Sequence, residues 1–305
     1  MTAMIAPQKV RFAVTPPASA LRDTAFDDYL QHCETLGFDT LWLSDIPLGD
    51  QGDPLLHLTY AAARTKRLKL GANIVPLGRN PLWLAKQLTQ LDRMSNGRLL
   101  LSFVPGLGTP AERAALGYEQ GDRGAKLEEI LSMLRTWWAG GQVTGSCHSA
   151  RFGELALEPR PLQQPLEVWL GGKGPLALER VARAADGWLT SVITPPEARL
   201  ARETIEARAQ QLGRHIDPEH FGISIPVARR APPEAAISAL RVRREDRDLT
   251  DIVAVGTPRL RALIGAHLDA GLSKFVLRAC NALDPAADWR ADLEWLAESV
   301  LDLQR

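Results

Sequence analysis

The sequence has few cysteines, no excess of either charge and no long apolar run. Its three cysteines, Cys33, Cys147 and Cys280, are odd in number and far apart, and no Cys-x-x-Cys pair occurs. A disulfide framework or a zinc site is therefore not expected. Lysine and arginine number 36, as do aspartate and glutamate. This balance argues against a nucleic-acid partner, which would require a clustered basic surface.

Membrane and export signals are lacking too. The N-terminal segment MTAMIAPQKV has no apolar signal core, and no apolar run approaches the length that a membrane-spanning helix needs. We therefore expect a cytoplasmic protein that binds neither membranes nor nucleic acids.

What the sequence does contain is clearest between residues 67 and 108. Two apolar runs, 68–75 and 98–104, flank a helix pattern that begins at Pro81 and ends at Asn96-Gly97. The apolar residues of that helix recur three or four apart: Leu84, Leu88, Leu91 and Met94. Strands that are apolar almost throughout are buried on both faces, as in a parallel sheet covered by helices.

This alternation of strand and helix continues along the chain. Strands are predicted at 10–15, 39–44, 68–75, 98–104, 166–170, 187–192, 221–228 and 274–277. Helices are predicted at 24–36, 55–64, 81–94, 126–138, 175–185, 195–212, 232–244, 259–270 and 285–303. Eight such units in 305 residues predict an α/β protein, a single (β/α)8 TIM barrel spanning 1–305, with insertions after strands four and seven. A doubly wound open sheet is the rival fold. The segments 107–123 and 140–165 are expected to be loops near the barrel mouth.

Active sites of such barrels lie at the carboxyl ends of the strands. Those ends contain one carboxylate, Asp45, no histidine and no cluster of metal ligands. A Gly-x-Ser-x-Gly nucleophile turn is also absent from the sequence. Hydrolysis is poorly supported by these residues, whereas an organic cofactor that brings its own reactivity would suit them.

The best binding signal is Gly171-Gly172-Lys173-Gly174, between a predicted strand and a helix. Glycines there let backbone N–H groups approach an anion, and the helix N-terminus and Lys173 add positive charge. A plain tight turn is the alternative interpretation. Thr190 and Ser191, at the end of the next strand, could offer hydroxyls to the same phosphate.

Other candidates have structural alternatives. Asp45 could contact a cofactor or bond the next loop, and Asn73 could meet a ring edge or a neighbouring backbone. Arg278, which ends a strand, is a better candidate anion ligand than Arg79. Most histidines are expected to be surface or satisfied residues, with His148 as the exception because the long connection could fold over the mouth.

Four segments resemble the luciferase-like monooxygenase superfamily. They are GFDTLWLSD (37–45), RLKLGANIVPLGRNPLWLAKQLTQLDRMSNGRLLLSFVPG (67–106), VWLGGKGPLALERVARAADGWLTS (168–191) and GTPRLRALIGAHLDAGLSKFVLR (256–278). The resemblance implies a TIM barrel that holds FMN or the deazaflavin coenzyme F-420, and many members are dimers.

Carried over by position, the resemblance assigns roles at the mouth. Asp45 would lie beside the cofactor ring, and Asn73 and Ile74 would form the unusual cis peptide that many members have behind it. Gly106 would lie at the mouth of the fourth strand. Gly171, Gly172 and Lys173 would bind the phosphate, with Thr190 and Ser191 nearby. Many members have a histidine after the residue matching Asp45, but this chain has Ile46.

The main functional hypothesis is a flavin-dependent oxidoreductase that uses reduced FMN to oxidise or reduce a small organic substrate, with coenzyme F-420 as the alternative cofactor. A flavin reductase or NAD(P)H would supply electrons, and a homodimer is expected. The catalytic candidates are Asp45 and His148. A non-catalytic cofactor-binding barrel is the alternative from another class. A phosphosugar isomerase or aldolase would need a strand-end lysine or paired carboxylates, of which only Lys173 is present.

Overall fold

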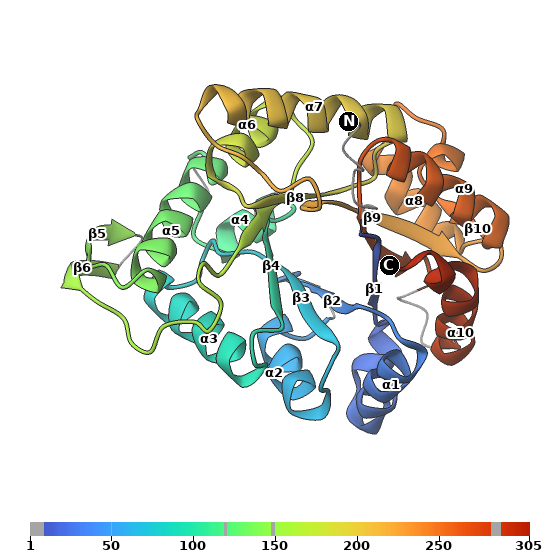
Figure 1. Ribbon diagram of the computed structural model, residues 1–305, viewed down its shortest axis with the longest axis horizontal. Coiled ribbons are helices and arrows are strands. Elements are labelled where there is room, and N and C mark those ends of the chain that lie inside the picture. Colours follow the sequence, from blue (N-terminus) through green and yellow to red (C-terminus); the bar gives the residue numbers. More distant parts are fainter. Residues whose placement is uncertain (1–8, 50, 119–120, 148–149, 282–287) are drawn as a thin grey trace, which may run out of the picture.

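The chain forms a closed barrel of eight parallel strands surrounded by helices (Figure 1). The computed structural model describes residues 9–49, 51–118, 121–147, 150–281 and 288–305. The barrel strands are β1 (Arg11–Thr15), β2 (Thr40–Ser44), β3 (Lys69–Ile74), β4 (Leu99–Phe103), β7 (Val168–Leu170), β8 (Gly187–Ser191), β9 (Phe221–Ala228) and β11 (Lys274–Ala279). They pair in that order around the barrel, which closes where β11 meets β1. The predicted TIM barrel is confirmed, and the open sheet is excluded.

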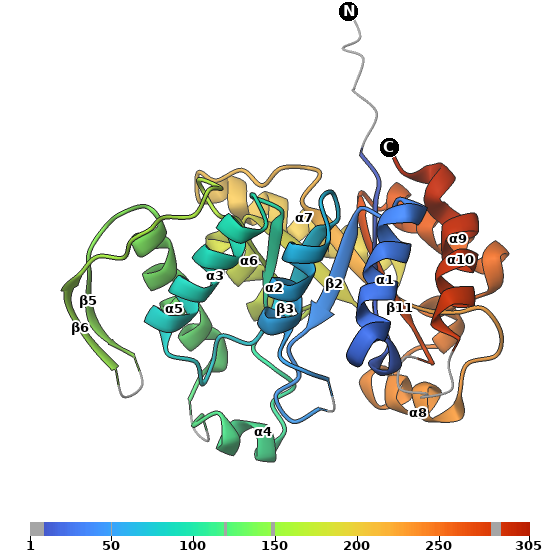
Figure 2. The same cartoon turned by 90° about the horizontal axis from the view of Figure 1, so that it is seen from below.

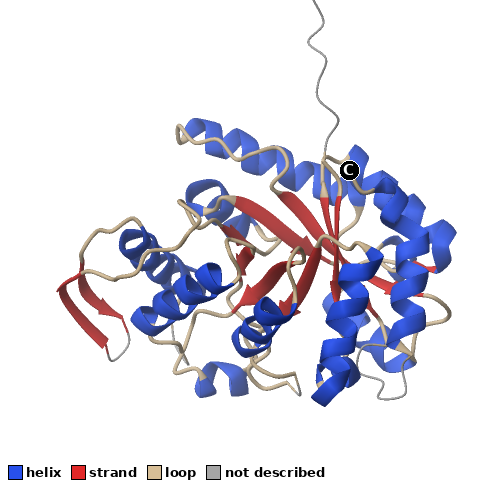
Figure 3. Cartoon of the chain, turned by 60° about the horizontal axis from the view of Figure 1, so that its bottom comes forward, coloured by secondary structure: helices blue, strands red, loops and turns tan. Residues whose placement is uncertain are grey.

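The helices lie outside the barrel, as Figure 3 shows. They are α1 (Asp23–Leu36), α2 (Pro54–Arg64), α3 (Pro81–Met94), α4 (Pro110–Ala115), α5 (Arg123–Trp138), α6 (Pro175–Ala184), α7 (Pro195–Gln211), α8 (Glu234–Arg243), α9 (Gly256–Asp269) and α10 (Trp289–Val300). Several begin at a proline behind a side-chain cap; Asn80, for example, accepts the Leu82 amide at 3.0 Å. No helix in the described part of the chain is long and apolar enough to cross a membrane.

Side chains alternate along each strand between the helices and the barrel interior. The outward residues join one large core with the helices. A smaller cluster fills the interior: Ala13, Trp42, Trp169, Leu189 and Val276, with Leu100 packed against it. Gly71 has no side chain on the wall beside Trp42, where a Cβ would overlap the indole ring. The barrel is therefore a packed core below its mouth.

Two segments differ in local structure from the sequence-based expectation, and one prediction lies outside the described residues. The segment 107–123, predicted as loop, contains the short helix α4 near the mouth. The chain between α8 and α9 adds a two-residue strand, β10 (Ala254–Val255), beside β9. The predicted start of the last helix, at 285, lies outside the described residues.

The expectation that 140–165 lies near the mouth is wrong for most of that segment. It forms a hairpin of β5 (Val143–Cys147) and β6 (Ala150–Leu155), which lies on the outside of the barrel against α5 (Figure 2). The Trp137 and Phe152 rings make an edge contact at 5.2 Å between centroids. Further on, Gln163 Nε2 donates to the Leu99 carbonyl at 2.9 Å, at the amino end of β4. Packing on Trp137 therefore draws the segment away from the mouth.

Candidate active site

The mouth of the barrel is lined by polar side chains at the carboxyl ends of the strands. By alternation this layer includes Thr15, Ser44, Asn73, Ser191 and Arg278, and also Ser102, which pairs in register with Asn73. Ser102 is buried and its hydroxyl has no hydrogen-bond partner in the described chain. The other five are partly exposed, whereas Ala13, Trp42, Leu189 and Val276 one layer below are buried. The strand ends thus carry a ring of polar side chains, called the bowl from here on, above an apolar floor.

The glycine turn lies on one side of this bowl, between β7 and α6. Gly171 is buried and donates its N–H to the Phe103 carbonyl at 3.2 Å, while Gly172 and Lys173 are exposed. Gly172 has φ +112°, a conformation that favours glycine. Within the described chain, the N–H groups of Gly172, Lys173 and Gly174 have no hydrogen-bond partner. Consecutive free amides before a helix N-terminus fit an anion such as a phosphate.

Lys173 adds a positive charge to this turn. Burial, followed by the positive charge of Arg244, lowers the pKa of Lys173 below its ordinary value. A phosphate bound at the turn would oppose this effect. The sequence-based candidates Gly171, Gly172 and Lys173 therefore do lie together in a turn that can bind an anion.

The next two candidates, Thr190 and Ser191, point to opposite sides of β8. Thr190 is 2% exposed and shares the outer side with Trp188, and its hydroxyl has no hydrogen-bond partner in the described chain. Ser191 faces the mouth, where its Oγ accepts a hydrogen bond from Arg243 Nη2 at 3.2 Å. Of the two hydroxyls, only that of Ser191 faces the bowl.

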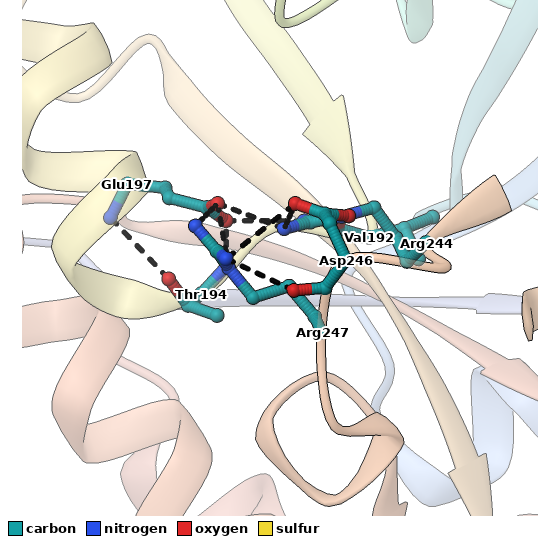
Figure 4. Close-up of polar contacts among 6 residues, drawn as sticks. All are labelled: Val192, Thr194, Glu197, Arg244, Asp246 and Arg247. Carbon is teal, nitrogen blue, oxygen red and sulfur yellow. Dashed lines mark hydrogen bonds and ion pairs between the residues drawn. The ribbon is translucent and has the colours of Figure 1, made fainter.

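The chain after Ser191 is held in a strained conformation. Val192 has φ +57°, which a β-branched residue adopts only when its surroundings impose it. Arg244 Nη1 donates to the Val192 carbonyl at 2.6 Å, and its guanidinium also binds Glu197 and Asp246 (Figure 4). Arg244 thus attaches the end of α8 to the end of β8.

Asp45 lies on the opposite wall, and one of its two carboxylate oxygens accepts two hydrogen bonds. Its Oδ2 accepts the Val75 amide at 3.1 Å and Arg79 Nη2 at 2.9 Å. Arg79 also binds Asp53, the cap of α2, at 3.1 Å. Burial raises the pKa of Asp45, although Arg79 opposes that shift. Asp45 therefore bonds the next loop, as the alternative interpretation held, and Arg79 forms an ion pair.

Asn73 and Ile74 end the neighbouring strand. Asn73 Nδ2 donates to Ser44 Oγ at 3.3 Å, and the Asn73 carbonyl accepts the Asp45 amide at 2.8 Å. Ile74 is fully buried on the outer face. The Asn73–Ile74 peptide is trans, so the cis peptide implied by the resemblance is not present there.

Gly106 lies in a loop that its own chain holds in place. It has φ +76°, and a Cβ there would overlap the Glu112 carboxylate. That carboxylate accepts the Leu107 and Gly108 amides at 3.2 and 2.8 Å, while Arg123 donates to the Gly106 carbonyl at 3.2 Å. Glu112 and Arg123 gave no signal in the sequence, because nothing in their spacing marks them as partners of this loop.

Two further findings concern the catalytic candidate His148 and metal binding. His148 lies outside the described residues. Among the residues that are described, no group of three histidine, cysteine or acidic side chains could hold a metal ion.

Comparison with known proteins supports this picture. The sequence model of the luciferase-like monooxygenase family matches residues 5–272 of this chain. The chain is 26% identical over 266 residues to 5,10-methylenetetrahydromethanopterin reductase of Methanolobus tindarius, which covers 87% of this chain and 72% of the relative. It spans about half the length of several other curated relatives.

Solved structures share the fold at low identity. An F420-dependent secondary alcohol dehydrogenase superposes with a TM-score of 0.79 at 15% identity, covering 97% of this chain and all of that one. The FMN-bound oxygenating constituent of 3,6-diketocamphane monooxygenase from Pseudomonas putida gives 0.75 at 15% identity, covering 97% and 99%. Because the family match covers most of the sequence, the chain belongs to the luciferase-like monooxygenase family of enzymes.

Proposed function

We propose that the protein is an oxidoreductase that holds a flavin or deazaflavin at the barrel mouth and acts on a small organic substrate. The observation that carries the proposal is the turn at Gly171–Gly174, with three unpartnered amides in the described chain and Lys173 beside an open mouth. These groups suit the phosphate of such a cofactor. The cofactor, when bound, would supply the electron-transfer chemistry.

The rest of the mouth would position the reactants. Ser44 and Asn73 present polar groups to the bowl, and Trp42 closes it below and excludes water. Asp45, which directly follows the inward-facing Ser44 at the end of β2, is the candidate proton donor in the described chain. Its Oδ1 has no hydrogen-bond partner in the described chain, and burial raises its pKa, so a proton on Oδ1 is favoured more than on an ordinary aspartate.

The choice of cofactor rests on the relatives. One structural neighbour is named for coenzyme F-420 and another holds FMN, and curated relatives include F420-dependent glucose-6-phosphate dehydrogenases. We favour a deazaflavin-dependent reductase or dehydrogenase, with an FMN-dependent monooxygenase as the second candidate. In the second case a flavin reductase or NAD(P)H would supply the electrons.

Titration of the purified protein with FMN, reduced FMN and coenzyme F-420, followed by fluorescence, tests the proposal. At least one of these cofactors should bind. Lys173→Gln should weaken the affinity for that cofactor about tenfold, because a charge-assisted contact is lost. Riboflavin, which has no phosphate, should be insensitive to that substitution. Failure of all cofactors to bind would refute the proposal. Binding without turnover of any reductant would favour the non-catalytic barrel.

We also propose that the protein forms a homodimer through α2 and α3, which pack side by side. Leu56, Tyr60 and Trp83 are 74%, 39% and 61% exposed on these helices, and clustered exposed apolar side chains are typical of interfaces. Leu56→Glu should yield a monomer in analytical ultracentrifugation, whereas Leu200→Glu on α7, 66% exposed, should not. Unchanged assembly in Leu56→Glu would contradict this interface.

A further inference from the structure

Two arginines meet on the wall of the mouth formed by β8, β9 and β11. Arg278 is half-buried and faces inward at the end of β11, where it pairs in register with Thr15 of β1 and Pro226 of β9. Arg243, the last residue of α8, comes from above the mouth and donates to Ser191 Oγ on β8. Two guanidinium groups from distant parts of the chain thus share one side of the bowl.

Neither arginine has a carboxylate partner among the described residues. The nearby acidic side chains are already engaged: Glu197 and Asp246 bind Arg244 and Arg247, and Asp292 binds Arg229 at 3.3 Å. Burial lowers the pKa of Arg278, and the like charge of Arg243 adds to this effect. A half-buried guanidinium without a counterion costs free energy, so this wall is arranged to receive a negative charge.

Arg243 is aimed at the mouth by its neighbour in the chain. Arg244 has other partners than Arg243: Glu197, Asp246 and the Val192 carbonyl hold it in place, as Figure 4 shows. Its side chain is only 3% exposed. Because Arg244 is fixed, Arg243 is presented above Ser191, and it forms no ion pair with any residue that the structure describes.

Arg278 lies away from the glycine turn, whereas Arg243 contacts β8, the strand beside that turn. Arg278 is on β11 and the turn follows β7, with β8 and β9 between them. Three strand spacings of about 4.8 Å amount to roughly 14 Å along the wall, whereas the oxygens of a single phosphate span only a few ångströms. Arg278 therefore suits an anion other than one bound at the turn. Arg243 lies between the two positions, since burial lowers the pKa of Lys173 and the charge of Arg243 also contributes to that shift.

We propose that Arg278 and Arg243, with Ser191, form a substrate subsite that binds a phosphate or carboxylate group, so that the organic substrate is an anion. This subsite rests on the proposed function, because it recognises a substrate beside a cofactor held at Gly171–Lys173. The same chemistry could instead come from a second anionic group of the cofactor, and the experiment separates these two sources.

The test is a calorimetric titration with inorganic phosphate, at constant ionic strength, of protein saturated with whichever cofactor binds. Wild-type protein should bind phosphate. Arg278→Gln should weaken that binding about tenfold, and Arg243→Gln about threefold because Arg243 is more exposed. Arg278→Lys should retain part of the affinity. Arg183→Gln is the control, since Arg183 is exposed on α6 and bound to Glu128, and should change nothing.

In parallel, the cofactor dissociation constant is measured for each variant, and thermal unfolding verifies that each is folded. The proposal expects this constant to change less than about twofold in Arg278→Gln and Arg243→Gln. Loss of cofactor affinity in these variants would assign the arginines to the cofactor and overturn the substrate subsite. Equal phosphate affinity in wild type and Arg278→Gln, or none in wild type, would overturn it as well. If no cofactor binds at all, the proposed function fails, and phosphate titration of the ligand-free variants still decides whether the arginines bind an anion.

Discussion

The two walls of the barrel mouth treat their arginines in opposite ways. On the β2–β3 wall, Arg79 lies between the Asp45 and Asp53 carboxylates at 2.9 and 3.1 Å. On the β8–β11 wall, Arg243 and Arg278 have no carboxylate partner in the described chain. A neutralised arginine fixes loops, whereas an unneutralised one at an open mouth is available for a ligand. Whether an arginine has a carboxylate partner therefore distinguishes a structural arginine from a ligand-binding one better than its position at a strand end does.

The largest expected effect comes from removing the anchor beneath the second wall. Arg244→Ala leaves Glu197, Asp246 and the Val192 carbonyl without their donor. We expect the free energy of unfolding, measured by urea denaturation, to fall by about 2–3 kcal/mol, less than for a fully buried pair because the Glu197 and Asp246 side chains are 30% and 62% exposed. Arg247→Ala, which removes a more exposed partner of Glu197, should cost below about 1 kcal/mol. Equal losses would contradict the anchoring role.

A pH dependence should follow from the same ion pair. Burial alone would raise the pKa of Glu197, but hydrogen bonds from Arg244 and the Thr194 amide outweigh it and lower the pKa to about 2. A carboxyl whose folded pKa is depressed stabilises the fold above its ordinary pKa of 4.5, and this contribution is lost as the pH falls towards 2. The stability advantage of wild type over Glu197→Gln should therefore shrink by about 2 kcal/mol between pH 5 and 2, after allowance for partial exposure. An advantage independent of pH would rule this out.

The comparison of the walls predicts a loss of stability for one substitution and no loss for its matched counterpart. Arg79→Gln leaves the buried Asp45 carboxylate with only the Val75 amide, and should reduce stability by about 1–2 kcal/mol. Arg278→Gln removes an uncompensated charge, so stability of the ligand-free protein should stay within about 0.5 kcal/mol or rise. Both variants change the net charge equally, and thermal unfolding at one salt concentration compares them. Similar destabilisation by both would mean that Arg278 is also a structural residue.

The smallest expected effect concerns the hydroxyl that positions Arg243. Ser191→Ala removes the acceptor of the 3.2 Å hydrogen bond. Because both groups are solvent-accessible, stability should change by less than about 0.5 kcal/mol, and phosphate affinity should fall about twofold through looser positioning of Arg243. Calorimetry measures the second effect. An affinity loss as large as that of Arg278→Gln would show that Ser191 binds the anion directly.

Much of the barrel could be predicted because local patterns and global packing agree. Pro81 and Asn96-Gly97 delimit α3 as predicted, and 221–228 is the full extent of β9. The β5–β6 hairpin was missed because its sequence, with glycines at 145 and 153 and many exposed residues, lacks strand alternation. Its position depends on Trp137 and Phe152, which only the packing of α5 brings together.

Within the site, the sequence by itself determined which backbone amides are free to bind an anion. Gly171–Gly174 lies between an apolar strand and a helix, and that local arrangement is sufficient to leave amides free. It could not determine the state of the charged side chains, because pairing depends on residues far apart in the chain. Asp45 and Arg79 form an ion pair, while Arg243 and Arg278 form none with the residues that the structure describes, because barrel closure decides which charges become neighbours. Tertiary structure thus decided which cations remain free to bind a ligand.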